Sequence, residues 1–136
     1  MSDLGAIMDQ LIAECRDAVP TLGAGALGAE RGVRIGEELS VSELPHVFAH
    51  SPAETVDLLD YQQEQRTVEV TLDLWVAGST QEALLLQLDA IRDQIASNRS
   101  LSGLVDYATV TGRRVFEAAS RDRKCGRIIV SAVEVV

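Results

Sequence analysis

The sequence predicts an α+β protein in which two helices pack on one face of a mostly antiparallel, four- to five-stranded sheet. Apolar residues recur at helical spacing within residues 3–18 and 80–97, whereas apolar and polar residues alternate strictly over 66–76. Hairpins and one helical crossover dominate the order of the elements, which favours helices layered on a sheet. The length of 136 residues suits one domain, 1–136, with a single packed core.

The first helix is expected over residues 3–18 and ends before Pro20, which cannot continue a helix. Polar residues such as Asp9, Arg16 and Asp17 lie opposite its apolar stripe. The stripe consists of Leu4, Ile7, Met8, Leu11, Ile12, Cys15 and Val19.

A glycine-rich connection follows over residues 21–40, with a short strand expected around 32–38. Gly23, Gly25 and Gly28 have the spacing of a dinucleotide-binding turn. Such a turn needs a strand before the glycines and a phosphate-facing helix after them. Here a helical pattern precedes the glycines and no apolar stripe follows them. We therefore expect either a flexible connection or a loop that orders on contact with a partner, rather than a nucleotide site.

Pro45 and Pro52 bound a brief strand predicted over residues 45–50, and these prolines suit the edge of a sheet. His46, Phe48 and His50 would share one face of this strand. Two histidines make a metal site conceivable, but no third ligand lies nearby in sequence. Residues 53–65 are acidic and polar, and we expect a loop there.

The clearest strand covers residues 66–76, and its second face carries Trp75 among polar residues. Ser79 or Thr80 can cap the next helix, predicted over 80–97, and Asn98 is expected to cap its end. Two closing strands are predicted over 107–118 and 127–136, joined by a charged tip. The side chains expected to face the core are Val68, Val70, Leu72, Leu74 and Val76 of the strand and Leu84, Leu88, Ile91 and Ile95 of the helix.

The net charge of −9 argues against a protein whose main task is to bind nucleic acid. The charge is uneven, because residues 1–110 hold 6 basic and 18 acidic side chains, whereas residues 111–136 hold 6 basic and 3 acidic ones. The basic end is either a solvated hairpin or a contact surface for an acidic neighbour. The N-terminus has no basic leader, and no apolar run approaches the roughly 20 residues that span a bilayer.

Catalytic chemistry is not expected. The two histidines lie on one short strand, and the chain contains neither a nucleophile elbow nor a P-loop. Cys15 and Cys125 have no metal-binding spacing, and we expect both to be reduced. We therefore predict no catalytic residues, no metal and no cofactor.

We expect another subunit to cover part of the surface of this chain, and this expectation is the one that points to function. The strand over 66–76 spans about 36 Å at ~3.3 Å per residue, whereas the helix over 80–97 covers only about 27 Å at ~1.5 Å per residue. The strand is thus longer than the helix that covers it, which favours an uncovered contact surface. The candidate residues for a subunit or partner interface are Trp75, Leu85, Leu86, Arg113, Arg114, Arg121, Arg123 and Lys124.

The order of elements resembles the tail terminator proteins of long-tailed bacteriophages and gene-transfer-agent-like particles. The segments that carry the resemblance are the opening helix and then "LPHVFAH", "RTVEVTLDLWVAGST", "ALLLQLDAIRDQIASN", "RSLSGLVDY" and "GRIIVSAVEVV". They extend over essentially the whole chain and match in the order and the general residue pattern of the elements rather than in a diagnostic motif.

This resemblance implies a structural virion protein without catalysis that forms a hexameric ring. The ring would cap the tail tube, stop its polymerisation and offer a surface to the head-closure or connector protein, while DNA passes through the lumen without sequence-specific binding. The implied location is the head-proximal end of the tail, after assembly in the bacterial host cytoplasm. A head-closure or neck adaptor is the main alternative, and a small nucleotide-binding protein is a second one.

Overall fold

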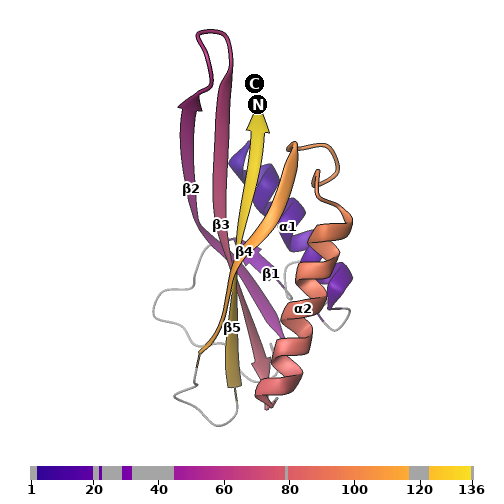
Figure 1. Cartoon of the computed structure of the whole chain (residues 1–136). Helices are drawn as coiled ribbons and strands as arrows, with labels where there is room; N and C mark the ends of the chain where they lie inside the picture. The colour runs from indigo at the N-terminus through magenta and orange to yellow at the C-terminus, as the bar shows by residue number, and fades with distance from the viewer. Residues whose placement is uncertain are drawn as a thin grey trace.

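The computed structural model describes residues 3–19, 22, 29–31, 45–78, 80–116 and 123–135. It confirms the α+β class, with both helices on the same face of one sheet (Figure 1). The strand order is β1-β2-β3-β5-β4, and β1 with β2 is the parallel pair among otherwise antiparallel neighbours. The elements are α1 (Leu4–Ala18), β1 (Ala29–Arg31), β2 (His46–Leu58), β3 (Glu64–Ala77), α2 (Gln81–Ser97), β4 (Tyr107–Phe116) and β5 (Arg123–Val135).

Both helices begin at side-chain caps. The Asp3 carboxylate accepts a hydrogen bond from the Gly5 amide at 3.1 Å, and the Thr80 hydroxyl accepts one from the Ala83 amide at 3.1 Å. Each cap satisfies an amide that has no partner within the first helical turn. Asn98 ends α2, as predicted. Its side-chain carbonyl also accepts a hydrogen bond from the Ser102 amide, which holds the following turn.

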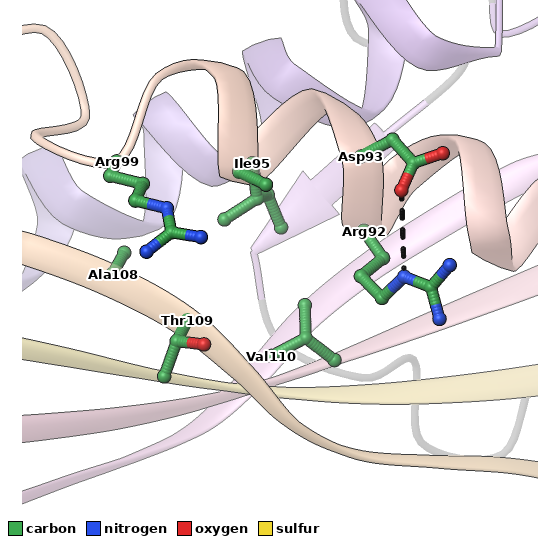
Figure 2. Close-up of a pocket in the computed structure, with 8 residues that line it drawn as sticks. Arg92, Asp93, Ile95, Arg99, Ala108, Thr109 and Val110 are labelled. Atoms are coloured by element: carbon green, nitrogen blue, oxygen red, sulfur yellow. Dashed lines mark ion pairs between the residues drawn. The ribbon is translucent and has the colours of Figure 1, made fainter.

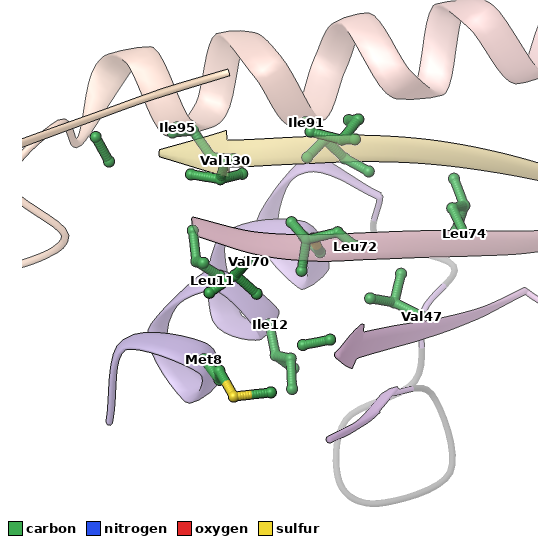
Figure 3. Close-up of a cluster of buried hydrophobic side chains, with 14 of the residues drawn as sticks. Met8, Leu11, Ile12, Val47, Val70, Leu72, Leu74, Ile91, Ile95 and Val130 are labelled. Carbon is green, nitrogen blue, oxygen red and sulfur yellow. The ribbon is translucent and has the colours of Figure 1, made fainter. Parts of the chain in front are cut away.

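The core lies between the helices and the helix-facing side of the sheet (Figure 3). Every residue predicted to face the core from the strand at 66–76 and from α2 is buried, which confirms the two periodicities. The stripe of α1 is buried as well, apart from Leu4, which is partly buried. The core is aliphatic, so that methyl and methylene packing rather than aromatic stacking stabilises it.

The hairpin that joins β2 and β3 corrects the sequence prediction. The strand predicted over 45–50 is present but ends too early, because β2 runs on to Leu58, and the loop predicted over 53–65 is wrong, because β3 starts at Glu64. Only residues 59–63 connect them. Polar composition predicts a loop when a strand is exposed on both faces, and residues 51–64 are all exposed. The edge prediction is wrong for Val47–Ala49, which pair with β1.

The ends of the chain differ in smaller ways. β5 starts at Arg123 rather than at 127, so the charged tip is shorter than predicted. β4 ends at Phe116, and residues 117 and 118 lie outside the described residues. The predicted strand around 32–38 and the glycines at 23, 25 and 28 also lie outside them.

A bulge interrupts each of the two outer long strands. On β2, His50 pairs with Thr71 and Ala53 with Glu69, so β2 holds one extra residue. On β4, Val110 and Gly112 pair with consecutive residues of β5, so Thr111 is extra. An extra residue moves the following side chains to the opposite face. Beyond the bulges, even-numbered residues of β2 and odd-numbered residues of β4 therefore face the helix side.

Candidate subunit interface

The predicted interface residues do not form one patch. Arg113 and Arg114 are neighbours on β4 and point to opposite faces. Arg113 lies on the helix side and forms an ion pair with Asp89 of α2. Arg114 lies on the face opposite the helices, here called the outer face, with its guanidinium carbon 4.9 Å from the centre of the Phe116 ring. Trp75 is half-buried on the outer face of β3.

The remaining predicted residues are also scattered. Leu86 is exposed on α2, and its neighbour Leu85 is half-buried. Lys124 is half-buried near the start of β5, opposite Val76. Arg121 and the side chain of Arg123 lie outside the described residues. The described positions among them therefore lie on different surfaces of the molecule, and their part in an interface stays a prediction.

The outer face carries a network of charged and polar groups. Asp73 of β3 accepts hydrogen bonds from Arg127 Nε and Nη2 at 2.8 and 3.1 Å, and His50 Nε2 lies 2.7 Å from its Oδ2 atom. The hydrogen bonds that the Arg127 guanidinium donates to Asp73 raise the pKa of Arg127. The Arg127 guanidinium carbon also lies 4.8 Å from the centre of the Phe116 ring. The network thus joins all four long strands.

This network places Ser51, His50 and Asp73 in a chain of hydrogen bonds, which sequence reasoning missed. His50 Nδ1 lies 2.8 Å from the Ser51 hydroxyl oxygen. A serine nucleophile needs an ionised carboxylate free to stabilise the imidazolium. Here the two-point contact from Arg127 offsets the charge of Asp73. Ser51 itself has a positive φ of 53° at the bulge of β2, so its position follows from strand geometry.

Neither cysteine is suited to nucleophilic chemistry. Burial raises the pKa of Cys15 to about 12, and Glu14 adds to the effect. Burial also raises the pKa of Cys125 to about 12, with a further contribution from Asp73. Such thiols stay protonated at neutral pH, and the protonated form is a poor nucleophile. Within the described residues, no group of three or more His, Cys, Asp or Glu side chains could hold a metal ion.

The surface that sequence reasoning missed is the tip of the β2–β3 hairpin, residues 56–64 (Figure 1). Tyr61 is 91 % exposed and Leu58 is 74 % exposed, and Val56 and Leu59 are exposed beside them. Contiguous exposed apolar side chains mark sites of protein contact. The period-two placement of Val56 and Leu58 in "TVDLL" is the signal that could have revealed the strand.

The hairpin tip is well ordered by its own hydrogen bonds. Asp60 Oδ1 accepts hydrogen bonds from the Gln62 and Gln63 amides at 2.7 and 3.0 Å. The Leu59 amide donates to the Gln63 carbonyl at 2.9 Å. Below the tip, the buried Arg66 bridges Glu54 of β2 at 2.5 Å and Glu134 of β5 at 3.2 Å. These hydrogen bonds and ion pairs fix the conformation of the tip, so its exposed side chains are held in place.

A cavity of about 230 Å³ lies between α2 and β4 (Figure 2). Ile95, Ala96, Ala108 and Val110 supply its apolar lining. Arg99 and Arg92 flank it, with Ile95 between them on α2. We call this site the α2–β4 cavity.

The two arginines of the α2–β4 cavity differ in their partners. Arg92 forms ion pairs with Asp93 at 3.5 Å and with Asp89 at 3.7 Å. The Arg99 guanidinium forms no ion pair or hydrogen bond within the part of the chain that the structure describes. Arg99 is thus available to an acidic or aromatic group that enters the cavity.

No protein-family model matches the chain, and no curated protein matches its sequence. The fold is similar to that of a chain in a solved structure described as the virion of a native gene transfer agent (GTA) particle. The TM-score is 0.64 at 10 % sequence identity, and the similarity covers 95 % of this chain and 94 % of the other. The two chains therefore share a fold over nearly their full lengths. No helix within the described residues is long and apolar enough to cross a membrane.

Proposed function

We propose that this protein is a structural component of a phage-like virion and that it acts as a tail terminator. The observation that carries this proposal is the fold shared, over 95 % of this chain, with a chain of a gene transfer agent virion. The exposed hairpin tip supports it, because an ordered projection with apolar side chains suits an assembling subunit. A role without catalysis is supported by the Asp73 carboxylate, whose charge Arg127 offsets, and by the protonated thiols of Cys15 and Cys125.

In this role, identical copies form a hexameric ring that caps the tail tube and stops its polymerisation. One side of the ring binds the tail tube protein, and the other binds the head-closure or connector protein. The net charge of −9 suits a ring whose lumen passes DNA, because acidic walls repel phosphates and do not retain the strand. The protein would then lie at the head-proximal end of the tail.

Native mass spectrometry and negative-stain imaging test the proposal, with the purified chain alone and with tail tube protein added. We expect a closed ring, either in isolation or at the end of a tube. A protein that stays monomeric in both conditions would overturn it.

Pull-down separates a terminator from a head-closure adaptor of similar size. We expect this chain to retain tail tube protein. Retention of the portal protein instead, with no binding of tube protein, would assign it to head closure.

A further inference from the structure

The hairpin tip of one molecule and the α2–β4 cavity of another are complementary in charge. The tip, residues 56–64, contains three acidic side chains, Asp57, Asp60 and Glu64, and no lysine or arginine. Arg92, Asp93 and Arg99 line the cavity; Arg92 is paired with Asp93, whereas the Arg99 guanidinium has no ion-pair or hydrogen-bond partner within the described residues. An acidic tip and an unpaired guanidinium attract each other most strongly where contact removes water from both.

The tip and the cavity are also complementary in shape and polarity. A cavity of roughly 150 Å³ is large enough for a benzene molecule, and the α2–β4 cavity measures about 230 Å³. It therefore has room for one phenol ring over its apolar lining of Ile95, Ala108 and Val110. Tyr61 presents such a ring, 91 % exposed, at the end of an ordered turn. A guanidinium at the rim can also lie over the face of the ring.

We propose that Tyr61 of one copy of this chain inserts into the α2–β4 cavity of the next copy, where the Asp60 carboxylate meets Arg99. The contact rests on the ring assembly proposed above and specifies the surfaces that form it. A tyrosine in a desolvated pocket beside an arginine is the composition typical of an interface hot spot.

The positions of the two surfaces determine the kind of assembly. β2 and β4 lie at opposite sides of the four long strands, and Figure 1 shows the hairpin on one side of the molecule and α2 on the other. Within one molecule the tip remains exposed, so it does not fill its own cavity. Contact between copies through two different surfaces is head-to-tail, and repetition of such a contact closes into a ring when the rotation permits.

Two single substitutions test the contact in the full-length chain. Tyr61→Ser removes the inserted ring, and Arg99→Glu reverses the charge that receives it. Each is expected to weaken association between subunits by roughly 30-fold or more, the range of a hot spot. Tyr107→Ser is the matched control. Tyr107 is an exposed tyrosine on β4, but it points to the face opposite that of its neighbour Ala108, which lines the cavity. Thermal unfolding followed by circular dichroism verifies that all three chains fold.

Disulfide cross-linking tests the geometry without altering Tyr61 or Arg99. The double variant Gln62→Cys/Ala96→Cys places one thiol in the tip, next to Tyr61, and one at the cavity, whereas the native cysteines are buried. On oxidation under ring-forming conditions, we expect a ladder of linked subunits that ends at the size of the ring. Gln62→Cys/Tyr107→Cys is the control and should stay unlinked.

The outcomes separate this inference from the proposed function. The hairpin contact is overturned, and the terminator role is left standing, by either of two results. One is that Tyr61→Ser and Arg99→Glu form rings as readily as the unaltered chain. The other is that rings of the Gln62→Cys/Ala96→Cys variant give no ladder of linked subunits. Absence of any ring from the unaltered chain, even with tail tube protein, would overturn both.

Discussion

Gly126 lies where β5 passes beneath α2, and replacing it with alanine is expected to destabilise the fold. A Cβ atom at this position would lie 2.8 Å from Leu88 Cδ1 and 3.2 Å from Leu88 Cγ. Leu88 is fully buried in the core, so its side chain has little room to move away. Extra methyl volume in a well-packed core costs about 1–3 kcal/mol. We therefore expect Gly126→Ala to lower the free energy of unfolding by about 2 kcal/mol.

Gly112→Ala is the matched control, because the nearest atom to its added Cβ would be Ile129 Cδ1 at 3.6 Å, an ordinary contact. That variant is expected to be neutral or slightly stabilising, since alanine restricts the unfolded chain. Urea unfolding followed by circular dichroism, at one fixed protein concentration, compares them. With a slope of roughly 2 kcal/mol per molar urea for a chain of this size, the midpoint of Gly126→Ala should fall by about 1 M.

A double-mutant cycle isolates the cause of the loss. If the added methyl group destabilises through Leu88, then Gly126→Ala and Leu88→Ala together should cost less than the sum of the two single changes. The argument from packing is refuted if Gly126→Ala unfolds at the same urea concentration as Gly112→Ala.

Three further predictions concern buried polar groups and the proposed absence of catalysis. Glu14 is buried and accepts hydrogen bonds from three side-chain amides on α1, α2 and the turn after it, so Glu14→Gln should lower the free energy of unfolding by about 1–3 kcal/mol in urea titration. The raised pKa values of Cys15 and Cys125, each about 12, mean that the folded state retains thiol protons that the unfolded state releases above about pH 8.5. Stability should therefore be intact below that pH and decline between it and pH 12, and Ellman's reagent should label neither thiol in the folded protein at pH 8. Ser51 should not react with a fluorophosphonate probe, because Arg127 engages Asp73; stoichiometric labelling at Ser51 would reverse the assignment.

The sequence predicts the buried parts of the fold well. Burial imposes a clear period, so the strand over 66–76 and the stripe of α2 can be recognised from apolar spacing alone, and the Thr80 cap follows from local chemistry. The exposed end of the β2–β3 hairpin shows this period only at Val56 and Leu58, because both of its faces meet solvent and most of its other residues are polar. The bulge near Pro52 also breaks the alternation.

The candidate site was predicted only as a class, an interface left uncovered by a strand longer than its helix. Its location depends on facts that sequence spacing cannot supply. Arg113 and Arg114 look like one basic patch, but strand geometry places them on opposite faces. The α2–β4 cavity joins residues 92–99 with 108–110 across a turn, and Arg99 has no sequence feature that distinguishes it from other surface arginines.

The two bulges lie at the same height in the sheet, since that of β2 is opposite Val70, that of β4 adjoins Val130, and Val70 pairs with Val130. Both margins of the four long strands are therefore one residue longer than the middle. A surface whose borders exceed its centre in length becomes saddle-shaped, with β3 and β5 along its spine. Deleting the extra residue from each margin would flatten this curvature and change the direction in which the β2–β3 hairpin projects. The aliphatic core beneath the helices would keep its packing.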